Sequence, residues 1–376
     1  MSKLEELIQK LCPDGAEYIS IGSTVNYEQP SKYIVNSTDY NDDFSTPVLT
    51  AGQSFILGYT DEKDNLYSAS KENPVIIFDD FTGAFKWVDF PFKVKSSAMK
   101  MLTANAHKTT LRYIYHSMGN IGYSSDEHKR LWISIYSEIK IPLPPLPVQQ
   151  EIVRILDKFT ELEAELEAEL VARNKQYEYY RDELLTFGDD IQSRTAVRWM
   201  TLGEIADIGT GSSNTNEELE VGNYPFFVRS QEVRRKNTFE YDETAIITSG
   251  DGVGVGKIFH YIEGKYALHQ RAYRIHINDE SVLPKYYYHY MRSSFLPYIQ
   301  RNAVNSSVTS IRRHMLTDFP VPIPSVEEQE RIVAILDRFD TLVNDITQGL
   351  PAEIAARRKQ YEYYRDKLLT FKEKVS

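Results

Sequence analysis

The chain contains the same long stretch twice, and this internal repeat constrains the fold more than any other feature. The first copy, residues 172–187, reads ARNKQYEYYRDELLTF, and the second, residues 356–371, reads ARRKQYEYYRDKLLTF. A similar prelude precedes each copy, IVRILDKF at 152–159 and IVAILDRF at 332–339. A repeat with a period of about half the chain indicates a duplicated architecture.

The length and composition are typical of a folded protein with more than one domain. A chain of 376 residues favours two domains with connecting structure. No apolar run approaches the roughly 18 residues of a membrane span, and Glu5 and Glu6 stand where a signal peptide needs a basic start. The single Cys12 excludes a disulfide framework and a cysteine zinc site. We therefore expect a cytoplasmic protein.

The charge is unevenly distributed along the chain. The net charge of −11 argues by itself against a nucleic-acid partner. Residues 84–130, however, carry 8 Lys/Arg against 3 Asp/Glu, and residues 257–313 carry 9 against 3. Much of the acid lies in the helical repeat, at Glu161, Glu163, Glu165, Glu167 and Glu169. This pattern indicates acidic helices together with two basic domains.

Both halves predict the same order of elements. A short helix over Leu4–Leu11 precedes an opening strand at 18–23, whose counterpart in the second half is 199–204. Short β-like runs separated by Gly, Asn and Asp follow in each half and favour compact mixed sheets. Each half then becomes helical, around 113–118 and 286–291, and closes on a strand with proline at alternate positions, 139–147 and 319–324. Such prolines restrict these strands to sheet edges or extended exits.

The two long helices differ in continuity. Ile152, Ile155, Phe159, Leu162 and Leu166 lie at spacings of three and four, which favours a coiled coil, and Leu170, Tyr177 and Leu184 continue this seam. In the second copy, Gly349-Leu350-Pro351 predicts a helix break. We expect a continuous central helix and a broken final helix that bury their seams against each other in antiparallel orientation. The expected fold class is α+β, with two pseudo-repeated mixed α/β domains joined by two long antiparallel coiled-coil regions.

Motifs for catalysis are weak. The glycine run at 249–257 is not a phosphate-binding loop, because no glycine stands five positions before Gly256 and Ile258 replaces the required Ser/Thr; it favours a flexible turn. Asp251, Glu263 and Lys265 have the spacing of a magnesium-dependent nuclease, but the pattern is short and the first half has no match. No HExxH motif, Cys-His cluster, convincing Ser-His-Asp set or adenine-methyltransferase motif appears.

Binding residues are better represented. Arg, Gln and Asn read base edges, while Ser, Thr and Lys hold phosphates. The Tyr-rich blocks on the helical seam favour packing or subunit contact, and we assign Tyr177, Tyr180, Tyr361 and Tyr364 to that role. The residues predicted to contact DNA are Lys86, Lys95, Lys129, Arg130, Arg229, Arg235, Lys257, Gln270, Arg271, Arg301, Asn305, Ser307 and Arg312.

The whole chain resembles the specificity subunits of type I restriction–modification enzymes. The resemblance is carried by the two tyrosine blocks and by four further motifs: the Pro-Leu-Pro and Pro-Ile-Pro exits at 142–144 and 322–324, QQEIV at 149–153, EQERIV at 328–333, and the ELEA tetrapeptides at 161–168. The resemblance is carried by specific motifs in the helical regions. In the two globular halves it rests only on the layout of the predicted elements.

The resemblance implies a domain plan and a set of partners. Target-recognition domains are expected at 1–145 (with the short N-terminal helix) and 195–324, and helical conserved regions at 146–194 and 325–376. Each domain would read one half of a bipartite, asymmetric double-stranded DNA site. The helices would dock two adenine methyltransferase (modification) subunits, to which restriction/translocase subunits are added. The subunit would have no catalytic residues, metal or cofactor of its own; S-adenosylmethionine, ATP and magnesium would belong to the partners.

Two alternatives from other classes remain open at this point. One is a magnesium-dependent nuclease that uses Asp251, Glu263 and Lys265. The other is a non-catalytic coiled-coil scaffold whose globular ends bind proteins.

Overall fold

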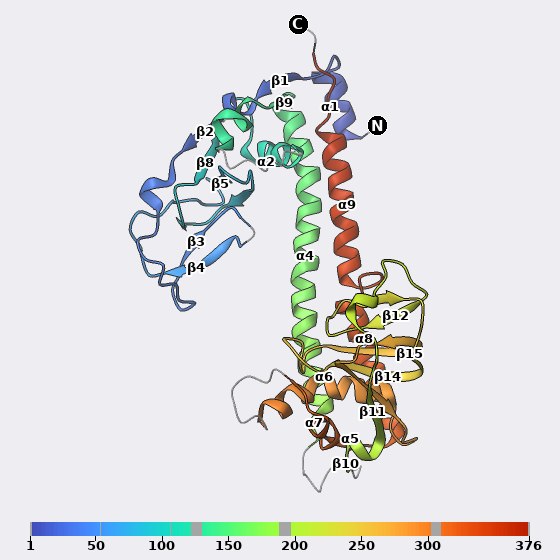
Figure 1. Ribbon diagram of the computed structural model, residues 1–376. Coiled ribbons are helices and arrows are strands. Elements are labelled where there is room, and N and C mark those ends of the chain that lie inside the picture. The colour runs from blue at the N-terminus through green and yellow to red at the C-terminus, as the bar shows by residue number, and fades with distance from the viewer. Residues whose placement is uncertain are drawn as a thin grey trace. The chain divides into compact units, whose positions relative to one another are not determined.

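The chain forms two compact units, of which the first combines two segments distant in sequence and the second is one continuous stretch. Residues 1–166 and 354–376 form unit 1, and residues 167–353 form unit 2. Each unit therefore combines one globular part with helix from both copies of the repeat (Figure 1). The computed structural model describes residues 2–52, 54–105, 107–121, 130–187, 197–301 and 310–374.

The globular part of unit 1 contains two small sheets and a covering helix. Strand β5 is apolar on both faces because both faces are covered: Ile76 and Phe78 face the core under helix α2, and Val75 and Ile77 face a second core. The four-stranded sheet has the order β2-β8-β5-β6 and is antiparallel, and the three-stranded sheet has the order β4-β3-β7 with β3 and β7 parallel. The elements are β2 (Val25–Glu28), β3 (Thr46–Leu49), β4 (Ile56–Thr60), β5 (Val75–Asp79), β6 (Phe85–Val88), β7 (Lys93–Val94), β8 (Met99–Ala104) and α2 (Leu111–Gly119).

Unit 2 repeats this layout in one larger sheet. Its strand order is β11-β16-β14-β15-β12-β13, antiparallel except for the parallel pair β12 and β15. Helix α6 packs against β14 and β15, as α2 packs against β5 and β8. The predicted duplication therefore extends to strand order. The elements are β11 (Ala206–Thr210), β12 (Tyr224–Phe227), β13 (Arg234–Lys236), β14 (Tyr241–Ser249), β15 (Phe259–Leu268), β16 (Ala272–Ile277) and α6 (Pro284–Arg301).

Each globular part closes on a two-stranded sheet that contains the proline-spaced strand. β1 (Glu17–Ser20) pairs with β9 (Lys140–Leu143), and β10 (Arg198–Thr201) pairs with β17 (Pro320–Ile323). Both strands of a two-stranded sheet are edges, so the predicted edge position of the prolines is confirmed. The opening strands are shorter than predicted. The chain turns into a 3-10 helix at Ile21–Ser23 and into α5 at Leu202–Ile205, where Thr201 and Glu204 form a capping box.

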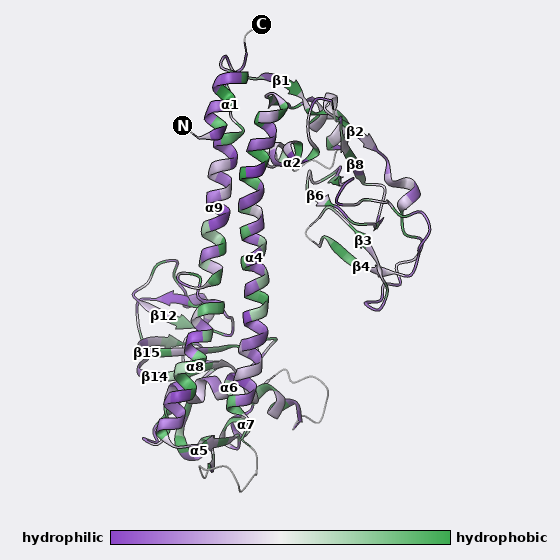
Figure 2. Ribbon diagram, turned by 180° about the vertical axis from the view of Figure 1, so that it is seen from behind, coloured by the Kyte–Doolittle hydropathy of each residue, from purple (hydrophilic) through white to green (hydrophobic). Residues whose placement is uncertain are grey.

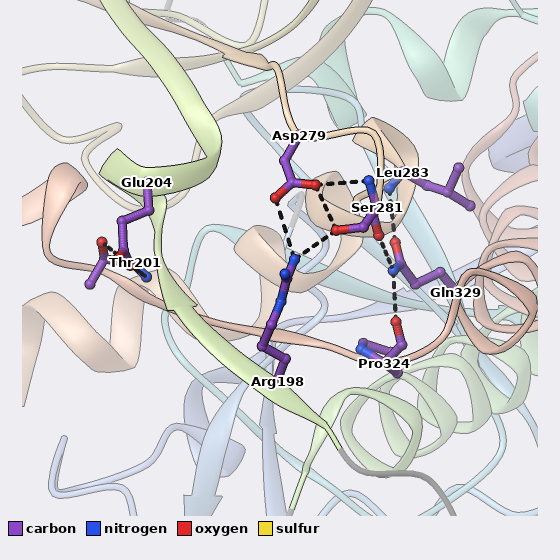
Figure 3. A network of polar contacts seen from close by, with 8 residues as sticks. All are labelled: Arg198, Thr201, Glu204, Asp279, Ser281, Leu283, Pro324 and Gln329. Atoms are coloured by element: carbon purple, nitrogen blue, oxygen red, sulfur yellow. Dashed lines mark hydrogen bonds and ion pairs between the residues drawn. The ribbon is translucent and has the colours of Figure 1, made fainter.

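A buried glutamine fastens each long helix to its globular part. Gln329, near the start of α8 (Val326–Asn344), is fully buried. Its Nε2 donates to the carbonyls of Ser281 (2.8 Å) and Pro324 (2.9 Å), and its Oε1 accepts from the Leu283 N–H (Figure 3). Arg198 stabilises the same turn by donating to Ser281 Oγ at 2.7 Å.

Unit 1 repeats this attachment at the start of its own helix. Gln149, near the start of α4 (Leu146–Leu185), donates to the carbonyls of Pro144 and Lys108 and accepts from Thr109 Oγ1. Each helix is therefore held at the same point by the same residue type.

The helices pair in antiparallel orientation within each unit, as predicted. In unit 1, Phe159 of α4 contacts Tyr364 of α9 (Leu350–Leu368), and Glu163 of α4 contacts Arg358 of α9. Residue numbers therefore rise along α4 in the direction in which they fall along α9. In unit 2, the later part of α4 packs on α8. Figure 2 shows hydrophobic residues recurring between hydrophilic ones along α4 and α9.

The predicted difference in continuity is also found, with one correction. α4 is a single helix, and the second copy is broken into α8 and α9. However, α8 ends at Asn344, several residues before Gly349, because the Asp345 carboxylate accepts from the N–H groups of Thr347 and Gln348 and forms a turn. The remaining elements are α1 (Lys3–Leu11), α3 (Leu131–Ser134), α7 (Arg313–Thr317) and the 3-10 turns Pro30–Tyr33, Tyr136–Glu138 and Thr215–Glu217.

Candidate functional site

Several loops of unit 2 meet at one end of its sheet. Thr210 and Ser249 end β11 and β14, and Ala272 begins β16. Register pairs Ser249 with Ala272 and Thr210 with Tyr273, so these three strand ends are adjacent. The segments that follow Thr210 and Ser249 therefore lie beside the segment that precedes Ala272.

Backbone hydrogen bonds tie these loops to one another. The Gly250 N–H donates to the Arg271 carbonyl at 2.9 Å, and the Ile311 N–H donates to the Gly250 carbonyl at 2.8 Å. The Gln270 N–H donates to the Ser213 carbonyl at 3.0 Å. A side chain added at Gly250 would come within 2.5 Å of the Arg271 carbonyl oxygen, so the close approach requires glycine. We call this set of segments, 211–215, 228–234, 250–256, 269–271 and 310–312, the loop cluster.

Asp251 joins two arginines at the centre of the loop cluster. Its Oδ1 accepts from Arg229 Nη1 at 2.7 Å, and its Oδ2 accepts from Arg271 Nη1 at 3.2 Å. Partial burial alone would raise the pKa of Asp251, but the bonds and charges of Arg229 and Arg271 lower it below the ordinary value. The side chains of Arg229 and Arg271 remain 40% and 61% exposed. The carboxylate therefore fixes two cations that still face outward.

An amide pair lies beside these arginines. Gln270 Nε2 donates to Asn214 Oδ1 at 2.5 Å. Next to it, His269 is buried, and burial followed by the charge of Arg229 lowers its pKa, which favours the neutral ring. Its Nδ1 accepts from the Arg271 N–H, so His269 shapes the turn. Sequence reasoning missed Asn214, because nothing in the sequence links it to a residue 56 positions away.

The glycine-rich run forms the predicted turn between two strands, β14 and β15. Gly252 and Gly256 adopt positive φ of 83° and 69°, which glycine tolerates at little cost. Val253 at the tip of this turn is 96% exposed. The tip of the turn at Gly252 and Val253 is therefore exposed, whereas residues 254–256 are buried and Gly254 lies against the Arg229 carbonyl.

The nuclease arrangement is ruled out by geometry. Glu263 pairs across the sheet with Thr244, which precedes Asp251 by seven positions; β14 ends two residues before Asp251, and seven extended residues span about 20 Å. Lys265 lies near Asp242 instead. Across the described ranges, no three His, Cys, Asp or Glu residues gather as a metal site would require. The three motif residues therefore cannot share one metal ion.

Unit 1 has an equivalent loop cluster with different residues. The Asp80 N–H donates to the Ala98 carbonyl and the Leu131 N–H to the Asp80 carbonyl, as Gly250 and Ile311 do in unit 2. The Lys95 N–H donates to the Leu49 carbonyl, as His269 donates to Phe227. Two residues predicted to contact DNA therefore belong to this second cluster: Lys95 and, directly before Leu131, the exposed Arg130.

Four of the predicted DNA contacts belong to the loop cluster of unit 2: Arg229, Gln270, Arg271 and Arg312, which directly follows Ile311. The other described ones are scattered. Lys257 is exposed at the end of the glycine run. Lys86 is half-buried in β6, Arg235 lies in β13 opposite Pro225, and Arg301 ends α6 with Nε directed to the Pro297 carbonyl. Lys129, Asn305 and Ser307 lie outside the described residues.

Part of the basic excess read from the sequence is neutralised inside the fold. Lys100 is buried against Asp80 at 2.9 Å, with side-chain exposures of 1% and 2%. Lys93 is buried against Glu62. Both acids lie outside the basic window 84–130, so a window count overstates the charge available to a partner.

The tyrosines assigned to a subunit interface also make contacts within the chain. Tyr177 is buried against Phe339, and the Tyr361 hydroxyl lies 2.9 Å from His116 Nδ1. Tyr180 and Tyr364 remain 37% and 39% exposed. Contact of these residues with another subunit stays a prediction.

Comparison of the sequence with known proteins identifies the family of this chain. The sequence profile described as type I restriction modification DNA specificity domain matches residues 13–172 and again 197–356. The chain belongs to the type I restriction–modification specificity subunit family. Membership gives it a non-catalytic role in DNA sequence specificity within a type I restriction–modification system, and specificity subunits carry no cofactor of their own.

Relatives match over nearly the full length. The specificity subunit of the type I restriction enzyme EcoR124I/EcoR124II from Escherichia coli is 44% identical over 405 aligned residues, covering 99% of this chain and 97% of that protein. A putative type I restriction enzyme specificity subunit from Haemophilus influenzae is 32% identical, covering 85% of this chain and 86% of that protein.

Two solved structures share the fold. The S subunit of a type I restriction–modification system from M. genitalium aligns with a TM-score of 0.64 at 14% identity, over 98% of this chain and 99% of its own. A chain solved in work on complex assembly of the type I system aligns with a TM-score of 0.55 at 17% identity, over 96% and 98%. In the part of this subunit that the structure describes, no helix is long and apolar enough to cross a membrane.

Proposed function

We propose that this specificity subunit reads a bipartite, asymmetric DNA site, with one half-site for each domain. Residues 1–145 and 195–324 act as the two target-recognition domains, and the helical regions 146–194 and 325–376 hold them. The loop clusters are the surfaces that meet DNA.

The observation that carries this proposal is that equivalent positions in the two loop clusters hold different residues. The carbonyls of Ala98 and Arg271 accept equivalent hydrogen bonds, and the N–H groups of Lys95 and His269 donate equivalent ones. One scaffold with different side chains at its reading edge supports two different half-sites, because base identity is read by side chains in the groove.

We further propose that two adenine methyltransferase subunits dock on the duplicated helices. Tyr179 and Tyr363 are 64% and 61% exposed, and each packs edge-to-face on the next tyrosine, Tyr180 or Tyr364. Exposed aromatic pairs are common at protein interfaces. Two copies of one surface support two copies of one partner.

The partners supply the chemistry in this proposal. S-adenosylmethionine is bound by the modification subunits, and ATP and magnesium serve the restriction/translocase subunits that join them. Because this larger complex encloses the DNA, the net negative charge of the specificity subunit does not contradict DNA binding.

Domain replacement tests this function. Residues 195–324 are exchanged for the corresponding domain of another family member, the complete system is expressed, and methylated adenines are mapped across the genome. The expected result is that one half-site changes and the other is retained. Loss of both half-sites from a complex that still assembles would contradict modular reading, and unchanged half-sites would favour the scaffold alternative.

A further inference from the structure

The arginine pair at the centre of the unit 2 loop cluster has a geometry suited to one kind of DNA contact. We infer that Asp251 is a positioning residue that holds Arg229 and Arg271 to read guanine in the half-site of the second domain. The inference rests on the proposed function and adds the base recognised, the residues that recognise it and the residue that orients them.

Both guanidinium groups are held in place but remain accessible. Each gives one nitrogen, Nη1, to a different oxygen of the same carboxylate. An arginine side chain carries five N–H donors in a planar fork, so the contact with Asp251 leaves donors for a further two-point contact. Exposures of 40% and 61% leave both forks accessible.

The backbone that carries the Asp251 carboxylate is itself fixed. Ser249 Oγ donates to the Asp251 carbonyl at 2.8 Å, and the Asp251 backbone bridges to Ser310. Gly250 before it is held against the Arg271 carbonyl. The orientation of the two arginines is thus set by the sheet edge, which reduces the side-chain entropy lost on binding.

The charge of Asp251 favours a base contact over a phosphate contact. A carboxylate with lowered pKa stays ionised at neutral pH, and its negative charge repels a phosphate placed beside the same arginines. A base edge carries no net charge, so it escapes that repulsion.

The donor pattern of the two arginines matches guanine. A guanidinium fork matches the two acceptors O6 and N7 that guanine presents in the major groove, whereas adenine presents a donor beside its acceptor. Two forks fixed by one carboxylate therefore select G·C pairs.

The test uses the complete complex with its modification subunits. After methylome mapping defines the site, binding is measured for duplexes in which each G·C pair of the second half-site is replaced by A·T in turn. We expect the wild type to lose binding on the order of ten- to a hundredfold at a pair read by Arg271. Arg271→Lys, which keeps the charge but not the fork, is expected to abolish this preference while affinity for unrelated DNA stays within about twofold. Arg229→Lys is expected to abolish the preference for guanine at the G·C pair that Arg229 reads.

Asp251→Asn tests the positioning role. It should reduce the preference for guanine but increase affinity for unrelated DNA, because one negative charge is removed from the binding surface. Asp251→Glu should restore part of the preference. A residue with a merely structural role would instead lower specific and unrelated binding together, and that outcome would overturn the role of Asp251.

Arg198 provides the matched control. It is 55% exposed and pairs with Asp279, which follows β16 at the end opposite Arg271, about 20 Å along the strand. Arg198→Lys should leave every base preference intact.

Two further results would overturn the inference. One is a uniform loss of affinity in Arg271→Gln with a salt dependence reduced by about one ion, which indicates a phosphate contact. The other is an unchanged half-site in both Arg229→Lys and Arg271→Lys. If domain replacement still changes that half-site, only the guanine inference fails; if domain replacement changes nothing either, the proposed function fails with it.

Discussion

Tyr364 stacks on Phe159, with ring centroids 5.2 Å apart and an angle of 22° between the rings. The first repeat contributes the phenylalanine and the second contributes the tyrosine. The reciprocal pair, Tyr180 on Phe339, has centroids 5.7 Å apart and an angle of 28°. Each tyrosine block therefore packs on the prelude of the other repeat, and neither repeat completes its helix pair alone.

The tyrosines give the first prediction. Alanine at Tyr180 and Tyr364 is expected to weaken assembly with the modification subunits, because each change removes an exposed ring and the stack that orients it. Analytical ultracentrifugation of the mixed subunits measures the assembled fraction. Tyr180→Phe and Tyr364→Phe keep both rings and should assemble normally. A fully assembled alanine variant with reduced sequence discrimination would instead place these rings on DNA.

The buried ion pair of Lys100 and Asp80 gives the second prediction. Lys100→Met should destabilise unit 1 by about 3–5 kcal/mol, because it leaves the Asp80 carboxylate buried without its cation. Asp80 also accepts from the Trp132 N–H at 2.8 Å, so α3 should loosen. Denaturant unfolding measures the loss. Lys95→Met, at an exposed lysine nearby, should change stability by less than about 0.5 kcal/mol, and an equal effect of the two changes would refute the distinction.

The helical framework was predictable from the sequence, because its signals are local. Hydrophobic spacing defined the seam through Phe159, the prolines defined the edge strands, and the repeat defined the order of the elements. The break before α9 was predicted, but its position was displaced, because the turn made by Asp345 is set by side-chain hydrogen bonds that periodicity does not record.

The loop cluster was only partly predictable, since its contacts are distant in sequence. Arg229, Gln270 and Arg271 were selected for their chemistry, but their joint position depends on the strand register. Asp251 was noticed for a metal-binding spacing and turned out to hold arginines instead. The charge count for residues 84–130 included Lys100, whose partner Asp80 lies outside that window.

A third prediction concerns pH. His116 of α2 is buried against Asp157 of α4 and Tyr361 of α9, with Arg112 and Arg365 nearby. Burial, the largest effect, lowers the pKa of His116; the bond to Asp157 opposes it and the Arg112 charge adds to it.

The sign follows from proton binding. Below the unfolded pKa of about 6.5 the unfolded chain binds the proton more readily, so the stability that His116 contributes is present above that pH and lost as pH falls. The melting temperature should therefore drop between pH 7.5 and 5.5. The drop should be smaller in His116→Gln, which retains His260 and His269, whose pKa values are also lowered by burial. An equal drop in both proteins would contradict this assignment.

A fourth prediction concerns the two ELEA tetrapeptides in α4, Glu161–Ala164 and Glu165–Ala168. Deleting Glu165–Ala168 shortens a helix by about 6 Å and rotates it by roughly 40° beyond a full turn, and it keeps the leucine spacing. DNA advances about 3.4 Å and 36° per base pair. If α4 sets the separation of the recognition domains and the opposing helix adjusts, the spacer should shorten by about one base pair with both half-sites unchanged. Methylome mapping of the deletion variant tests this, and an active variant with the original spacer would refute it.

Genome-wide mapping of methylated adenines in cells expressing the complete wild-type system tests the central claim most directly. We predict a bipartite motif with two different half-sites, a fixed spacer of unspecified bases between them and one methylated adenine in each half. A single continuous motif, or two identical half-sites, would contradict the reading of one half-site by each domain.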